Sequence, residues 1–187
     1  MECINIFGDS FGASVHSDSW VSLLGKEYSI KNYCINGASE YRILQSIKDN
    51  TPNEGVVILV HTNPYRIFVE YNPLHQGSTH NNCDIVASDI VYHKNTAFGN
   101  AAMKYFKFLF SEKMQDDFYD MCVLEENRLL SKCKVIHTTH FNTNRDMIHF
   151  DYTNSKNKGN INHYDKKGNW LVYNQLRNEI IKPSSGQ

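Results

Sequence analysis

Four residues with the side-chain chemistry of acyl transfer occur in order along the chain. Ser10 lies in GDSF, Gly37 in INGAS, Asn63 in LVHTNPYR and His163 in INHYDKKGN. A serine hydroxyl attacks an acyl carbon well only when a base removes its proton, and a neutral histidine can do this near pH 7. The oxyanion that forms needs preplaced N–H donors, which backbone amides and an asparagine side chain supply. These residue types therefore predict nucleophilic attack on an ester.

The elements around these residues alternate between strands and helices, which predicts an α/β domain with a parallel sheet and helices on both faces. Predicted strands cover 3–7, 28–36, 55–60 and 133–141, and predicted helices cover 18–27, 40–50, 101–132 and 165–181. Ser39 is expected to cap the second helix, and Asp165 the last. The apolar run from Val56 to Val60 is typical of a strand covered on both faces. We therefore expect a single domain over residues 1–181 and a flexible tail over residues 182–187.

Ser10, Gly37 and Asn63 each follow the end of a predicted strand. In an open parallel sheet the carboxyl ends of the strands form one edge, and ligands bind in the crevice outside it. We therefore expect the three residues to meet at this edge.

The segment GDSFG also reads as G-x-S-x-G, the nucleophile elbow of the α/β-hydrolases. In that fold an oxyanion N–H comes from a loop after an earlier strand. Only seven residues precede Gly8. This interpretation therefore fails.

The order of the four blocks resembles that of the GDSL/SGNH hydrolase family, and NPYRIFVE is similar to a version of the third block in GDSL-like proteins of tailed phages. The resemblance implies a single three-layer α/β/α domain, flavodoxin-like, and a serine esterase that works through an acyl-enzyme intermediate. It assigns Ser10 as the nucleophile and His163 as the base. The oxyanion hole would be formed by Ser10, Gly37 and Asn63. By the same analogy, a carbohydrate O-acetyl ester is a candidate substrate.

Two blocks depart from the family pattern. The third is usually G-x-N-D, and here His61 and Pro64 flank the central pair; the last is usually D-x-x-H, and here Asn160 replaces the aspartate. Three hypotheses stay open: a Ser10–His163 dyad steadied by Asn160 or a backbone carbonyl, a carboxylate from elsewhere such as Asp151, or an inactive site. The last would make the protein a catalytically impaired binding module for a sugar or another small ligand.

Substrate-binding candidates near these blocks are Asp9, His61 and Arg66. Arg66 either pairs with Glu70, four residues on, or meets a polar substrate. Residues 65–100 are weakly periodic and are expected to form a loop excursion or lid. At helical spacing, Phe106, Leu109 and Phe110 predict core positions, as Leu171, Leu176 and Ile180 do in the last helix.

Composition argues against several partners and cofactors. Nineteen basic and twenty acidic residues give a net charge of −1, so no electrostatic capture of nucleic acid or of a membrane is expected. Five cysteines without C-x-x-C spacing predict neither a disulfide framework nor a zinc cluster. His137 and His140, on one predicted strand, should face opposite sides of the sheet, so no metal and no cofactor is predicted. The absence of a signal-like start predicts a cytoplasmic protein; the oligomeric state stays open.

Overall fold

The structure is a computed structural model that describes residues 2–13, 16–74, 82–141, 145–150 and 163–183. Within these residues, five strands form one sheet in the order β2-β1-β3-β4-β5, and every neighbouring pair is parallel. The strands are β1 (Cys3–Gly8), β2 (Ser29–Asn32), β3 (Gly55–His61), β4 (Cys133–Thr139) and β5 (Ile148–His149). This is the 2-1-3-4-5 order of one common kind of doubly wound sheet. The predicted parallel α/β architecture is confirmed.

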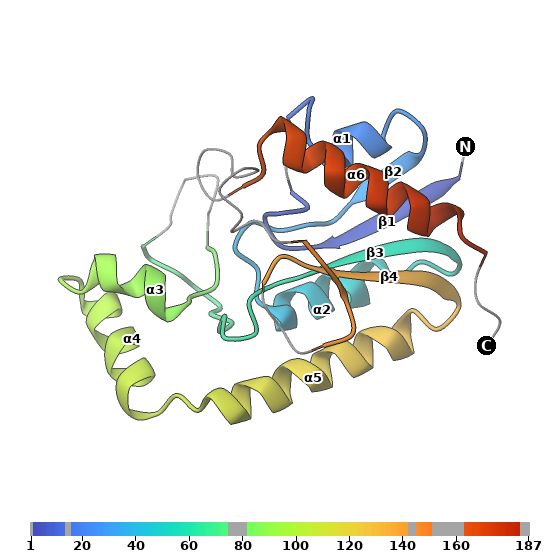
Figure 1. The fold of residues 1–187 in the computed structure, drawn as a ribbon. Coiled ribbons are helices and arrows are strands. Elements are labelled where there is room, and N and C mark those ends of the chain that lie inside the picture. The colour runs from blue at the N-terminus through green and yellow to red at the C-terminus, as the bar shows by residue number, and fades with distance from the viewer. Residues whose placement is uncertain (1, 14–15, 75–81, 142–144, 151–162, 184–187) are drawn as a thin grey trace.

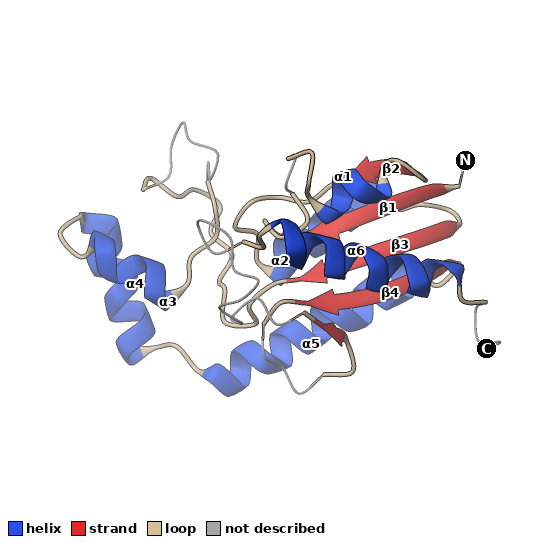
Figure 2. Cartoon of the chain, turned by 45° about the horizontal axis from the view of Figure 1, so that its top comes forward, coloured by secondary structure: helices blue, strands red, loops and turns tan. Residues whose placement is uncertain are grey.

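Helices cover both faces of the sheet, as Figures 1 and 2 show. Helices α1 (Trp20–Leu24) and α6 (Lys166–Ile181) pack on one face, and α2 (Glu40–Asn50) and α5 (Glu112–Leu129) pack on the other. Successive strand residues point to opposite faces. Ile58 and Val60 therefore join the α1/α6 core, whereas Val57 and Leu59 join the α2/α5 core.

The central strand and two helix caps follow the sequence-based expectations. Every residue from Val56 to Val60 is buried, as predicted for a strand covered on both faces. The Ser39 hydroxyl accepts from the Arg42 N–H at the start of α2. Asp165 caps α6 by accepting from the Gly168 N–H at 2.7 Å. This cap, two residues after His163, fixes the start of α6.

Between β3 and α5 the chain forms an excursion with its own small core. It contains α3 (Ala87–Ile90), the 3-10 helix η1 (Val91–His93) and α4 (Ala97–Phe108). An isolated antiparallel bridge joins Ile67 to Ile85 at its base. Ile85, Ile90 and Ala102 form the buried cluster of this part.

Several predicted boundaries and core positions differ from the structure. The helix expected over 101–132 is two helices, because the Ser111 hydroxyl caps a new helix by accepting from the Met114 N–H. Leu109 is 73% exposed and Leu171 is 43% exposed, so their predicted core positions are wrong. Within the described part of the chain, no neighbouring element covers either side chain.

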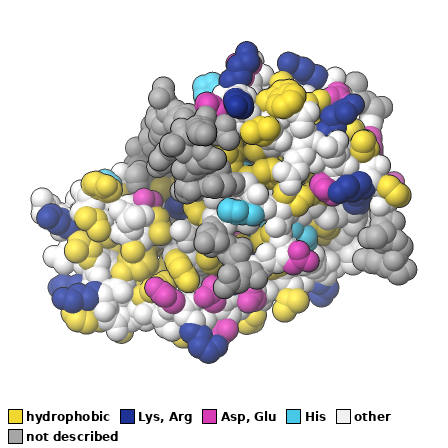
Figure 3. Space-filling model, viewed as in Figure 1, with side chains coloured by type: hydrophobic (Ala, Val, Ile, Leu, Met, Phe, Trp, Pro, Cys, Tyr) yellow, Lys and Arg dark blue, Asp and Glu magenta, His cyan; other side chains and the backbone are white. Residues whose placement is uncertain are grey.

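Exposed apolar side chains gather over the α3–α4 end on the face drawn in Figure 3, and acidic side chains follow the beginning of α5. The exposed apolar residues of this end include Tyr92, Met103, Phe108 and Leu109. No helix in the described part of the chain has the length and apolar character needed to cross a membrane.

Candidate functional site

Ser10 occupies a tight turn directly after β1. A Cβ on Gly8 would lie 2.5 Å from the Val60 Cβ and carbonyl oxygen, so only glycine allows this approach to β3. The Asp9 N–H donates to the Val60 carbonyl at 3.3 Å, and the Asp9 carboxylate accepts from the Phe11 N–H at 3.0 Å. Asp9 and Phe11 are buried, whereas Ser10 between them is partly exposed. The turn thus holds Ser10 outward at the carboxyl edge of the sheet.

Gly37 lies in the loop between β2 and α2 in a left-handed conformation, with φ +66°. A Cβ here would meet the Cys83 Cβ at 2.4 Å, so a side chain is excluded by both conformation and space. The Ile35 N–H donates to the Gly8 carbonyl at 2.9 Å. This hydrogen bond places the loop beside the end of β1.

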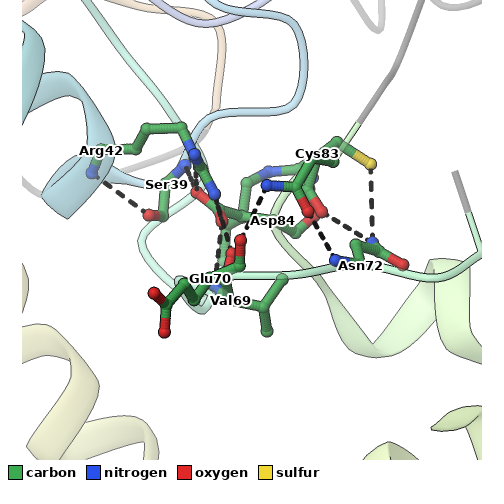
Figure 4. A network of polar contacts seen from close by, with 9 residues as sticks. Ser39, Arg42, Val69, Glu70, Asn72, Cys83 and Asp84 are labelled. Carbon is green, nitrogen blue, oxygen red and sulfur yellow. Dashed lines mark hydrogen bonds and ion pairs between the residues drawn. The ribbon is translucent and has the colours of Figure 1, made fainter. Parts of the chain in front are cut away.

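A buried carboxylate, Asp84, ties the Gly37 loop to the excursion (Figure 4). The Asp84 N–H donates to the Gly37 carbonyl at 2.9 Å. Its carboxylate accepts from the Ser39 N–H at 2.7 Å, from the Val69 N–H at 2.9 Å and from two nitrogens of Arg42. The bond to Asp84 raises the pKa of the Arg42 guanidinium. The start of α2 and the base of the excursion are therefore one connected structure.

Asn63 comes two residues after the end of β3 and shapes the turn that follows. Its side-chain oxygen accepts from the Tyr65 N–H at 2.8 Å, and its carbonyl accepts from the Arg66 N–H at 3.0 Å. Because the amide oxygen is engaged, the amide NH₂ is the part of the side chain left to bind a ligand. Among the described residues, no hydrogen bond engages this NH₂, the Ser10 hydroxyl or the Gly37 N–H.

His163 lies beside the residue that follows Ser10. Its ring stacks on the Phe11 ring, with centroids 5.0 Å apart and an interplanar angle of 23°. His140, just after β4, also stacks on Phe11, at 4.2 Å and 10°. The structure therefore brings His163 into the neighbourhood of Ser10. Asn160 and Asp151 lie outside the described residues.

His140 and His137 face opposite sides of the sheet, as their spacing predicts. His140 Nδ1 donates to the Tyr164 hydroxyl at 2.7 Å, because that hydroxyl gives its own proton to the Phe150 carbonyl. Burial lowers the pKa of His140 to about 3, so the ring is neutral. His137 instead contacts Asn127 on α5. The two histidines cannot share a ligand.

The three predicted substrate-binding residues occupy different environments. Asp9 is 2% exposed and His61 is fully buried on the α2/α5 face, so neither side chain lies at the protein surface. Arg66 donates to the Asp84 carbonyl at 2.9 Å and lies 3.9 Å from the Asp89 carboxylate. Arg66 therefore does not form the ion pair with Glu70 that was one of its two predicted roles. Its charge does act on the Asp9 carboxyl, at the base of the Ser10 turn.

Burial raises the pKa of the Asp9 carboxyl to about 7, against the opposing effects of the Phe11 N–H and the Arg66 charge. The folded protein therefore holds this proton between about pH 4 and pH 7, where the unfolded chain releases it. The resulting stabilisation, about 4 kcal/mol, is fully present at low pH and is lost as pH rises through 7.

Asp9→Asn should remove this pH dependence, because the amide stays neutral and still offers an oxygen to the Phe11 N–H. Relative to the wild type, the free energy of unfolding of the variant should rise by about 4 kcal/mol between pH 4 and pH 8. Urea denaturation at a series of pH values measures the difference. A difference that stays constant over this range would contradict the assignment.

Comparison with known proteins finds no family profile and no curated relative that matches this chain. The chemistry of the site therefore follows from its geometry and residue types alone.

Proposed function

We propose that this protein is a serine esterase with Ser10 as its nucleophile. The proposal is supported by the positions of Ser10, Gly37 and Asn63 after the ends of β1, β2 and β3, at one edge of the sheet, and by the stacking of His163 on Phe11. Ligands of doubly wound sheets bind at this edge, where the strand order reverses between β1 and β3. The resemblance of the four blocks to the GDSL/SGNH pattern supports the same assignment.

In the proposed reaction, the Ser10 hydroxyl oxygen attacks the ester carbon while His163 takes the hydroxyl proton. The carbonyl oxygen becomes an oxyanion that the Ser10 and Gly37 N–H groups and the Asn63 NH₂ stabilise. His163 then passes the proton to the departing alcohol, and the C–O bond to that alcohol breaks. Water, activated by the same ring, hydrolyses the acyl-enzyme and restores Ser10. A carbohydrate O-acetyl ester is the substrate class that we propose.

A second candidate is a binding module for a sugar or another small ligand, with impaired catalysis. It is favoured by Asn160, an amide at the position where the D-x-x-H pattern has a carboxylate. An amide carries no charge to stabilise the imidazolium that forms as Ser10 attacks.

Labelling with a fluorophosphonate probe separates the two candidates, because only an activated serine attacks the phosphorus. A serine esterase should give one labelled peptide, containing Ser10, by mass spectrometry. An unlabelled folded protein that binds acetylated sugars in calorimetry would instead support the binding module.

The proposed role of Asn63 predicts a specific loss in the Asn63→Asp variant. The aspartate keeps an oxygen for the Tyr65 N–H and so preserves the turn, but it removes the NH₂ donor. Loss of one oxyanion donor typically lowers kcat by about 10²–10³-fold. Steady-state hydrolysis of a p-nitrophenyl ester should show this loss with little change in KM. If kcat is unchanged, Asn63 only shapes the turn.

A further inference from the structure

Two glutamates and a histidine meet in the interior between β3, α2 and α5. Glu40 is the first residue of α2, His61 is the last of β3, and Glu126 lies on α5. All three are buried, and one potential ligand atom from each lies within 4.8 Å of the others. His61 Nδ1 is 2.5 Å from a Glu40 oxygen and 3.9 Å from a Glu126 oxygen.

Glu126 has acidic and imidazole neighbours in this cluster but receives no hydrogen bond within the described residues. Its side chain is fully buried, and neither carboxyl oxygen hydrogen bonds to any described residue. The Tyr119 hydroxyl is also buried without a described partner, and its ring centroid lies 6.2 Å from that of His61. Burying a carboxyl group without a partner is costly, so the arrangement calls for a group that satisfies these oxygens.

The hydrogen bonds from His61 to His137 and on to Asn127 determine the tautomer of His61, that is, which of its ring nitrogens carries the proton. The Asn127 NH₂ donates to the Val123 carbonyl, so the Asn127 oxygen is the atom that faces His137 Nε2, at 3.0 Å. His137 therefore donates at Nε2 and accepts at Nδ1. His61 Nε2, 2.8 Å away, supplies the proton for that bond. In a neutral His61 ring, the lone pair is then on Nδ1, which points at Glu40 and Glu126.

We propose that Glu40, His61 and Glu126 bind a divalent transition-metal ion such as Zn²⁺. Imidazole nitrogen and carboxylate oxygen are both ligands of this ion. Two carboxylates also balance its charge, which a fully buried site requires. The chain from His61 through His137 to Asn127 is the outer hydrogen-bonded support that a ligating histidine usually has.

Ligation requires a small rearrangement of Glu40. Two ligand atoms about 2.1 Å from a tetrahedral ion are about 3.4 Å apart, so the pair now at 2.5 Å must open. The second Glu40 oxygen accepts from the Thr62 N–H at 3.3 Å. The ion would thus be linked to the residue before Asn63 and to the helix that follows the Gly37 loop. It would hold these two segments together from inside the fold and would take no part in the proposed reaction.

The competing occupant is a proton. Burial and the neighbouring Glu40 raise the pKa of Glu126, and a proton shared between the two carboxyls would also neutralise the cluster. The two occupants can be distinguished by experiment. A bound metal ion is detected at one per chain after the protein has been separated from its buffer, whereas a proton leaves no metal to detect.

The test is to unfold the protein, remove metal with EDTA and refold it with Zn²⁺, with Co²⁺ or with EDTA alone. After desalting, we expect one ion per chain by elemental analysis, a visible d–d absorption band for Co²⁺, and a higher Tm with either metal than with EDTA. Glu126→Gln, which has nearly the same volume, and His61→Gln should weaken Co²⁺ binding. The loss should exceed the roughly 10–100-fold typical of removing an outer-shell partner. Glu125→Gln is the matched control, since Glu125 pairs with Arg128 at the surface of the same helix.

Refolded wild-type protein that retains no metal and has the same Tm with Zn²⁺ and EDTA would overturn the proposal, whether or not the variants fold. Undiminished Co²⁺ binding by Glu126→Gln and His61→Gln would also overturn it, because the ion would then be bound elsewhere. A Glu126→Gln protein that is more stable than the wild type, with no response of either protein to metal, would identify the proton as the occupant.

Discussion

Replacing Ser10 with alanine is expected to lower ester hydrolysis by about 10⁴-fold or more, the scale of loss when a serine nucleophile is removed. Ser10 is partly exposed at the tip of its turn, and the turn is held by Asp9 and Phe11. Ser10→Ala should therefore fold normally. The measurement is hydrolysis of a p-nitrophenyl ester, with circular dichroism as the check on folding.

Ser17→Ala is the matched control, because Ser17 is exposed in the same connection between β1 and α1. It should keep wild-type turnover and fluorophosphonate labelling. A folded Ser10→Ala protein that retains its activity would rule out Ser10 as the nucleophile.

Replacing His163 with alanine is expected to lower kcat by about 10²–10⁴-fold, the contribution of a positioned general base. The ring stacks on Phe11, the residue after the proposed nucleophile, so its removal leaves a space that a small base can enter. Added imidazole should therefore restore part of the lost kcat in His163→Ala. A purely structural role for the ring would not give this rescue.

His149 is the natural comparison, because it lies exposed at the end of β5 on the same edge of the sheet. His149→Ala should keep kcat within about threefold of the wild type, as is usual for a surface substitution. A large, imidazole-rescued loss in His149→Ala and none in His163→Ala would mean that the base had been assigned to the wrong histidine.

The fold was predictable from the sequence where the local residue pattern matches the burial that the structure gives each residue. The continuous apolar run of β3 and the caps Ser39 and Asp165 carry direct physical signals, and the structure confirms all three. Leu109 and Leu171 were misassigned because helical periodicity identifies an apolar side but not whether another element covers it. The two-residue strand β5 is too short to leave a periodic pattern.

Part of the candidate site was predictable for the same reason. The ends of parallel strands meet at one edge, so the convergence of Ser10, Gly37 and Asn63 follows once the strands are known. The link from Asp84 to Arg42 and the meeting of Glu40 with Glu126 do not follow. These contacts join residues far apart in sequence, and each looks like an ordinary surface charge until the helices are placed.

The hydrogen bonds of Asp84 also determine how this side of the molecule can move. A flap hinged at both ends of the excursion would have to break the bonds from Asp84 to Ser39, Arg42 and Val69 at once. The base of the excursion and the first turn of α2 should therefore open together, as one cooperative unit in amide hydrogen exchange. Among the described residues of the excursion, α3 and α4 lie beyond the bridge between Ile67 and Ile85, so they can move while this unit stays folded.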